Sequence, residues 1–272
     1  MSEVISSPRQ IPPIRQAARV LVHPVMVIFL IGVFYLVTIR PGHRWGDDFS
    51  MYILHARNIV QGIDYQDTGY LYDPFLAVIG PKAYPPVFPL ALAPVYAFFG
   101  LELTPMKVEV ICFFLLFLGV FYLSFKNDLT PSLMALTLAV IGLNPSIWNF
   151  KDDVISDFPF LFFVYLTLFV IQKAYTGPKP ARRKVTLAVL TGVLVYLSFG
   201  TRNVGIVILP ALFLYDLIRS RRPSLFPWIA SVVFFIGWYL QSLLIPGPSG
   251  YADQIAFLPV TVYNNLKNYS AA

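Results

Sequence analysis

Two adjacent carboxylates are the first residues whose type and spacing could do chemistry. Asp47 and Asp48 come directly before residues 49–60, in which apolar side chains recur at offsets 0, 3, 4, 7, 10 and 11, a helical spacing. Gly62 then supplies a C-terminal stop for this helix. Helix capping explains Asp48 alone as well as a functional role does. One cap suffices, however, and paired carboxylates can act as a general base or bind a cation. We therefore expect a functional site at the start of this helix.

Residues 151–159 carry a second group of acids. Asp152 and Asp153 fall in a short loop, where solvated carboxylates need no further role. Asp157 lies about one helical turn inside the apolar run that follows. An ionisable side chain at the edge of a membrane segment is by default a functional-site hypothesis. The sequence therefore offers Asp157, together with Asp153, as a second acidic site.

Two cations accompany these acids in the expected arrangement. Lys82 precedes a proline-rich segment, and Arg202 lies at the turn between two apolar runs. Both could hold a phosphate group, although anchoring to lipid headgroups explains either cation alone better. Glu109 is explained as an ion-pair partner of Lys107 or Arg57. The cations therefore gain a functional meaning only through their position beside the acids.

Familiar catalytic motifs are not found in the sequence. It has no Walker loop, no Gly-rich dinucleotide turn, no His pair at metal-ligand spacing and no Gly-x-Ser-x-Gly. His23, His43 and His55 are scattered, and we expect them to be structural. The single cysteine, Cys112, cannot form an internal disulfide or a Cys-rich metal site. The candidate chemistry rests on carboxylates and cations, with the metal unknown.

The composition of the chain indicates the class of protein in which these residues must be positioned. Hydrophobic residues make up 57% of the 272 residues and charged residues only 12%, and the mean hydropathy is +0.67. A soluble domain usually carries about 25% charged residues. This composition excludes a soluble enzyme, a disordered chain and a coiled coil. The net charge of +6 does not indicate nucleic acid as a partner, because the basic residues fall in short loops between apolar runs.

Apolar runs predict an all-α, multispanning membrane helix bundle of about seven spans. The expected spans are residues 20–39, 105–125, 131–148, 156–174, 185–200, 203–218 and 225–245. One more apolar run, residues 85–100, is rich in proline and is expected to be a broken, partly interfacial segment. Together with the amphipathic helix after Asp48, it would belong to an outer loop, residues 40–104.

This arrangement divides the charges between the two sides of the membrane. One side then holds 12 of the 20 Lys and Arg residues in short loops, which predicts a cytoplasmic N-terminus by the positive-inside rule. Residues 1–19 form a basic cytoplasmic segment, residues 20–245 the transmembrane domain and residues 246–272 an outer polar segment. Eleven of the 14 acids fall on the outer side. The outer face of the cell membrane is therefore expected to be the working face.

The order and sidedness of these motifs resemble a known family. The motifs are Gly46-Asp47-Asp48 before the amphipathic helix, Tyr84-Pro85-Pro86-Val87-Phe88-Pro89-Leu90, Asp157-Phe158-Pro159-Phe160 and Thr201-Arg202-Asn203-x-Gly205. Over roughly residues 20–220 the chain looks like the integral-membrane glycosyltransferases of the GT-C fold. Its pattern is most similar to bacterial transferases that decorate lipopolysaccharide and to protein O-mannosyltransferases.

The resemblance implies roles for the candidate residues. Asp47 or Asp48 would be the catalytic base, and Asp157 the second acid. Lys82, Arg202 and Tyr84 would bind the donor phosphate. Such enzymes move a sugar from a polyprenyl-phosphate donor to a hydroxyl of a lipid, glycan or protein, with inversion of configuration at the anomeric carbon. Some relatives use a divalent cation as cofactor, and others do not. Family members usually continue with further spans, so residues 246–272 are expected to begin a region missing from this chain.

Two readings from other classes compete with a transferase. A transporter or flippase of a lipid-linked solute would explain the spans equally well, but it predicts ionisable residues near mid-span, whereas the charges here cluster at the membrane edges. A structural membrane subunit without a site does not explain why acids gather on the outer side. The sequence therefore favours the transferase.

Overall fold

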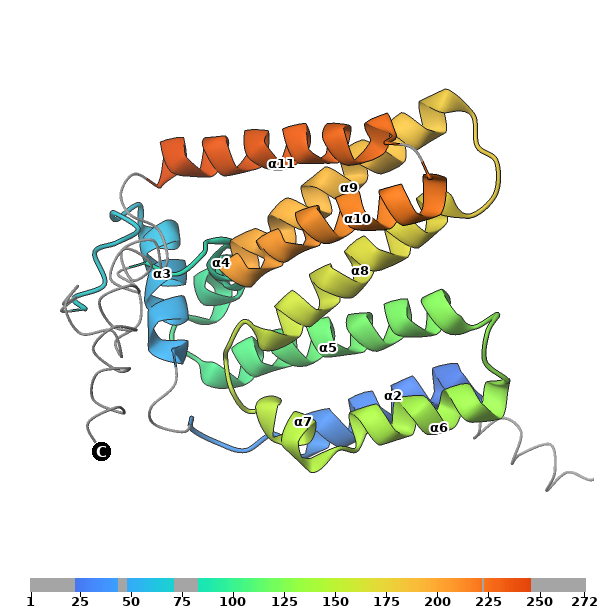
Figure 1. Ribbon diagram of the computed structural model, residues 1–272. Coiled ribbons are helices and arrows are strands. Elements are labelled where there is room, and N and C mark those ends of the chain that lie inside the picture. Colours follow the sequence, from blue (N-terminus) through green and yellow to red (C-terminus); the bar gives the residue numbers. More distant parts are fainter. Residues whose placement is uncertain (1–22, 44–47, 71–82, 222, 246–272) are drawn as a thin grey trace, which may run out of the picture.

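Every regular element in the described part of the chain is helical. The computed structural model describes residues 23–43, 48–70, 83–221 and 223–245 (Figure 1). Its helices are α2 (Pro24–Val37), α3 (Phe49–Gln61), α4 (Val87–Phe99), α5 (Leu103–Phe125), α6 (Pro131–Gly142), α7 (Pro145–Phe150), α8 (Asp157–Tyr175), α9 (Ala181–Thr201), the 3-10 helix η1 (Asn203–Val207), α10 (Ile208–Ser220) and α11 (Leu225–Leu244). The all-α prediction is confirmed for these residues.

Five helical segments are long and apolar enough to cross a membrane. They are α5, α8, α9, the continuous segment Asn203–Ser220 and α11, with lengths of 18 to 23 residues. At about 1.5 Å per residue, each matches a hydrocarbon core of about 30 Å. In the most apolar 18-residue stretch of each segment, at most 44% is buried within the protein. Most of their apolar surface therefore needs lipid as its solvent. The chain is therefore a multi-pass membrane protein.

The two remaining expected spans are shorter helices. The run expected over residues 131–148 is divided, because α6 ends at Gly142 and α7 starts anew at Pro145. The Asn144 side chain accepts hydrogen bonds from the backbone amides of Ser146 and Ile147, which is the pattern of a helix N-cap. The continuous helix predicted there is wrong. Helix α2 has 14 described residues, and residues 20–22 of the expected span lie outside the described ranges.

The proline-rich segment forms one helix, which corrects the broken segment predicted from the sequence. Helix α4 runs through Pro94 and ends at Gly100, whose φ of +63° suits glycine. Its 13 residues extend about 20 Å, less than the thickness of a hydrocarbon core. The helix packs against α3, α5 and α9.

Figure 1 shows how these helices are arranged in space. Helices α2, α5, α6, α8, α9, α10 and α11 run alongside one another, and α3 lies across one end of them. We call this end, where α8 and α10 begin and α9 and α11 end, the α3 end. The opposite end, called the basic end, holds the α5–α6, α8–α9 and α10–α11 connections. Its described cations are Lys126, Lys173, Lys179, Arg182, Arg183, Lys184, Arg219 and Arg221.

The buried core centres on α5. Phe114 of this helix stacks on Tyr35 of α2 on one side and on Phe158 of α8 on the other, with ring centroids 5.3 and 4.5 Å apart. Helices α9 and α11 also pack closely. A Cβ at Gly192 of α9 would lie only 2.4 Å from the Ala230 carbonyl oxygen of α11. These contacts fix the helix ends that carry the candidate site.

Candidate functional site

A small cavity at the α3 end brings several predicted site residues together. Its volume is about 220 Å³. The lining comes from the start of α3, the approach to α4 and the junction between α9 and η1, namely Asp48, Tyr52, Tyr84, Pro85, Thr201, Arg202, Asn203 and Val204. Three of these, Asp48, Tyr84 and Arg202, were selected from the sequence. Segments more than 100 residues apart in the sequence therefore converge on one cavity.

Asp48 holds the first position before α3 without using its side chain as a cap. Its backbone carbonyl accepts hydrogen bonds from the amides of Met51 and Tyr52, but its carboxylate makes no capping hydrogen bond. The side chain is exposed and lines the cavity. The explanation of Asp48 as a side-chain cap is therefore wrong, and the carboxylate is available on the cavity wall.

A tight turn positions Arg202, which also lines the cavity. Helix α9 ends at Thr201, and η1 begins at Asn203, so that Arg202 alone is extended between them. The amide of Gly205 donates to the Arg202 carbonyl at 2.9 Å. A Cβ on Gly205 would lie 2.6 Å from the backbone nitrogen of Phe199, which no larger residue could accommodate without moving the backbone. The Thr-Arg-Asn-x-Gly spacing thus has a local structural cause.

Arg202 forms an ion pair with Asp157, the second predicted acid. The guanidinium nitrogen Nη1 lies 2.6 Å from the Asp157 carboxylate, and both side chains are about 40% exposed. Asp157 is the first residue of α8 rather than a residue one turn inside it. The pair is open to solvent on one side, so Arg202 remains accessible to an anion that enters the cavity.

Tyr52 is a site residue that the sequence did not reveal. It is buried on the inner face of α3, and its hydroxyl shares a hydrogen bond of 2.8 Å with the Ser156 hydroxyl. Burial raises the pKa of the Tyr52 phenol well above its ordinary value, while the Ser156 hydrogen bond and the Arg202 charge oppose this shift. The phenol is therefore protonated at neutral pH. The only hint of this role in the sequence was the place of Tyr52 on the apolar stripe, because a tyrosine hydroxyl needs a hydrogen-bond partner when it is buried.

The backbone of Tyr84 is held from two sides. The Tyr65 hydroxyl donates to the Tyr84 carbonyl at 2.8 Å, and the Tyr84 amide donates to Nε2 of His55 at 3.3 Å. Nδ1 of the fully buried His55 ring bonds to the Tyr65 carbonyl. Burial lowers the pKa of His55 to about 4, so its ring is neutral at pH 7. A neutral ring with its proton on Nδ1 satisfies both hydrogen bonds, and His55 has the structural role that we expected.

Comparisons of the chain with protein-family models, with curated proteins and with solved structures find no match. The chemistry of the cavity therefore follows from its own residues. An exposed carboxylate, Asp48, can accept a proton. The Arg202 guanidinium can bind phosphate with two parallel hydrogen bonds. The cavity is smaller than the 300 Å³ or more that is typical of sites enclosing a whole small ligand, so it fits the reacting part of a larger substrate.

The remaining acids of residues 151–159 are buried, which corrects the prediction of solvated loop acids. Asp152 is 7% exposed, and Asp153 and Lys151 are fully buried. The Asp152 carboxylate accepts from the Arg40 amide at 2.8 Å and pairs with the Lys151 ammonium group. The ammonium group of Lys107, 1% exposed, lies 3.9 Å from Asp152. We call these four residues, Arg40, Lys107, Lys151 and Asp152, the charge network. It ties the segment after α2 to the loop before α8.

The structure does not place the other predicted residues in the lining of this cavity. Asp47 and Lys82 lie outside the described residues, and Asp153 does not line the cavity. Neither partner expected for Glu109 pairs with it among the described residues, because Lys107 bonds to the carbonyls of Arg40 and Gly42 and Arg57 bonds to Asn58. One carboxylate oxygen of Glu109 is buried without a hydrogen-bond partner among the described residues. In the described ranges, no group of three or more His, Cys, Asp or Glu could hold a metal ion.

Proposed function

We propose that the chain is an integral-membrane glycosyltransferase that moves a sugar from a polyprenyl-phosphate donor to an acceptor hydroxyl. The observation that carries the proposal is the convergence of Asp48, Tyr84 and Arg202 on one cavity, with Asp157 paired to the arginine. This transfer needs a proton acceptor for the incoming hydroxyl and a cation for the departing phosphate. Both lie in the lining of this cavity, and the resemblance of the motifs to the GT-C fold agrees with this interpretation.

Asp48 is the candidate for the general base. Its carboxylate takes the proton of the acceptor hydroxyl while that oxygen bonds to the anomeric carbon of the donor sugar. The bond between this carbon and the phosphate oxygen breaks, and the electron pair leaves with the polyprenyl phosphate. A single displacement of this kind inverts the anomeric carbon. The acceptor is a lipid, a glycan or a protein.

Arg202 is the candidate that holds the departing phosphate. A polyprenyl phosphate is already a stable leaving group, so charge stabilisation matters more than protonation. The ion pair with Asp157 fixes the guanidinium while leaving part of it exposed. Tyr84 and the buried Tyr52 line the same cavity as the base and the cation. A divalent cation could assist the phosphate, although nothing in the transfer requires one.

The proposal includes seven spans and an outer face for the cavity. Helices α2 and α6 would join the five longer segments as spans, since all of these run alongside one another (Figure 1). Helices α3 and α4 would then lie in the outer interface, where short amphipathic helices are stable. The described cations of the α5–α6, α8–α9 and α10–α11 connections gather at the basic end, which the positive-inside rule assigns to the cytoplasm.

The direct test is turnover by the purified full chain. A panel of polyprenyl-phosphate hexoses and pentoses would be incubated with the protein and with extracted envelope lipids, glycans and proteins as acceptors. We expect release of polyprenyl phosphate and labelled acceptor from at least one donor. A transporter would instead move the intact donor across the bilayer of a proteoliposome without cleaving it. That result, without any cleavage across the panel, would overturn the proposal.

A further inference from the structure

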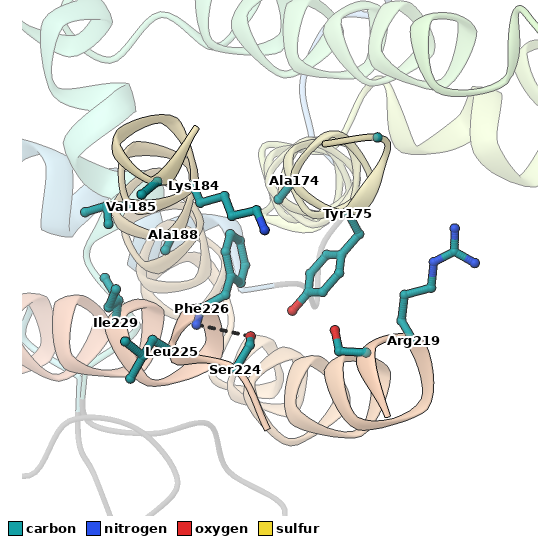
Figure 2. A pocket seen from close by; sticks show the side chains of 13 residues that line it. Ala174, Tyr175, Lys184, Val185, Ala188, Arg219, Ser224, Leu225, Phe226 and Ile229 are labelled. Atoms are coloured by element: carbon teal, nitrogen blue, oxygen red, sulfur yellow. Dashed lines mark hydrogen bonds between the residues drawn. The ribbon is translucent and has the colours of Figure 1, made fainter. Parts of the chain in front are cut away.

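A second, larger cavity lies at the basic end, far from the candidate site. Its volume is about 430 Å³, and α8, α9, α10 and α11 all contribute to it. The walls are mostly apolar, with Ala174, Val185, Ala188, Phe226 and Ile229 among the lining residues. Figure 2 shows the Lys184 side chain extending from α9 into the space beside Tyr175 and Phe226. Arg219 lies on the far side of Tyr175, at the edge of the same cavity (Figure 2).

The two cations of this cavity have no counter-ion among the described residues. Neither Lys184 nor Arg219 takes part in an ion pair there. The nearby carboxylate of Asp216 is occupied by hydroxyl and amide donors instead. It accepts from the hydroxyls of Tyr175 at 2.6 Å and Ser224 at 2.7 Å, and from the Ser224 amide at 2.8 Å. The cavity therefore combines apolar walls with a net positive charge.

We propose that this cavity binds an anionic phospholipid, with the headgroup attracted by the combined charge of Lys184 and Arg219 and the first part of an acyl chain against the apolar walls. Basic pockets between membrane helices on the cytoplasmic side are suited to anionic lipid headgroups. A free phosphate ester would use the cations but leave the apolar lining without an occupant. The inference rests on the membrane topology proposed above and not on transferase activity.

The test is competition binding to the full chain in an uncharged detergent. A fluorescent phosphatidylglycerol serves as the probe. We expect unlabelled phosphatidylglycerol to displace it, phosphatidylcholine to do so at least about tenfold less well, and glycerol 3-phosphate not to compete. Each neutralised cation removes about fivefold in affinity. Lys184→Gln and Arg219→Gln should therefore each weaken binding about fivefold, and the double variant about 25-fold.

Matched variants separate the cavity from general attraction to a basic surface. Lys126→Gln removes the same charge at the same end but outside the cavity, and it should leave affinity unchanged. Lys184→Arg keeps the charge and should retain binding, which tests whether the loss in Lys184→Gln follows the charge and not the replacement of lysine as such. Equal weakening by Lys126→Gln, wild-type affinity in the double variant, or full competition by glycerol 3-phosphate would each overturn the proposal. Binding without any transferase activity would leave it intact.

Discussion

The two ends of the helix bundle treat charged residues in opposite ways. At the α3 end, Lys107, Lys151 and Asp152 are buried in the charge network, and Arg202 is paired with Asp157. At the basic end, seven of the eight described cations are exposed and Lys179 is half-buried, and Asp216 bonds to hydroxyls instead of to them. Burying a charge costs free energy unless it is paired and hydrogen-bonded. Buried, paired charges therefore hold the backbone segments of the α3 end together, whereas the cations of the basic end can contact lipid and water.

The charge network and the bonds around it hold the backbone next to the α3-end cavity in place. Lys107 donates to the backbone carbonyls of Arg40 and Gly42, and Lys151 donates to the Thr38 carbonyl at 2.6 Å. Nε2 of His43 accepts from the Val154 amide at 2.9 Å. These bonds hold the chain that leads toward Asp48 against the loop that leads to Asp157. Asp157 of the candidate site thus follows a loop that buried charges hold in place.

If the α3 end faces outward and the basic end faces the cytoplasm, cysteines at the two ends should differ completely in labelling from outside the cell. In a Cys112→Ser background, a membrane-impermeant maleimide applied to intact cells should label Glu102→Cys at the α3 end but not Lys179→Cys at the basic end. The reason is that the basic connections should remain in the cytoplasm. Permeabilised cells should label both variants, which serves as the control for reactivity. Labelling of Lys179→Cys from outside would reverse the assignment of the two ends.

Removing a buried cation should affect stability far more than removing an exposed one. Lys151→Met leaves the Asp152 carboxylate with one fewer partner in a buried position, which should cost about 3–5 kcal/mol in free energy of unfolding. Lys126→Met, an exposed change at the basic end, should stay within about 0.5 kcal/mol. Denaturant titration of the purified chain in detergent measures both. Equal stability of the two variants would contradict the contrast between the ends.

The α3 end should also lose stability in acid through His55. Its pKa is about 4 in the folded protein and 6.5 when unperturbed, so the unfolded chain binds the extra proton first as the pH falls. This contribution is present above pH 6.5 and is lost progressively between pH 6.5 and about 4, to a total of about 3 kcal/mol. The His55→Gln variant should lack this part of the pH dependence, and His23→Gln should retain it. An unchanged acid profile in His55→Gln would show that the buried ring is not the cause.

Arg202 should contribute to phosphate binding in a way that another cation of the same end does not. Arg202→Gln should weaken binding of a polyprenyl phosphate, the product of the proposed transfer, by about tenfold. This value is at the low end for a charge-assisted hydrogen bond, because the side chain is 40% exposed. Arg57→Gln is the matched control, since Arg57 bonds to Asn58 and does not line the cavity. Fluorescence-quench titration in detergent measures both affinities, and equal affinities would reduce Arg202 to a surface anchor.

Sequence patterns predicted the features that depend on local spacing. The apolar stripe after Asp48 gave helix α3 with its stop at Gly62, and uninterrupted apolar runs gave the long helices. Patterns did not reveal the burial of Lys151 and Asp152, because their loop is polar in sequence and is covered by distant parts of the chain, the segment after α2 and Lys107 of α5. Tyr52 was missed for a similar reason. Its side chain fits an apolar stripe, and only the fold brings Ser156 to its hydroxyl.

The most direct test of the central claim is the transfer rate of Asp48→Asn. Asparagine keeps the shape of the side chain but cannot accept the acceptor's proton, and loss of a general base typically lowers the rate about 10²–10⁴-fold. Glu102→Gln removes an exposed carboxylate at the same end, outside the cavity, and should transfer sugar at the wild-type rate. With a donor that the wild-type chain uses, the measured quantity is polyprenyl phosphate released per minute. We expect a loss of at least about 100-fold for Asp48→Asn alone; a wild-type rate in that variant would contradict the assignment of the α3-end cavity as the transfer site.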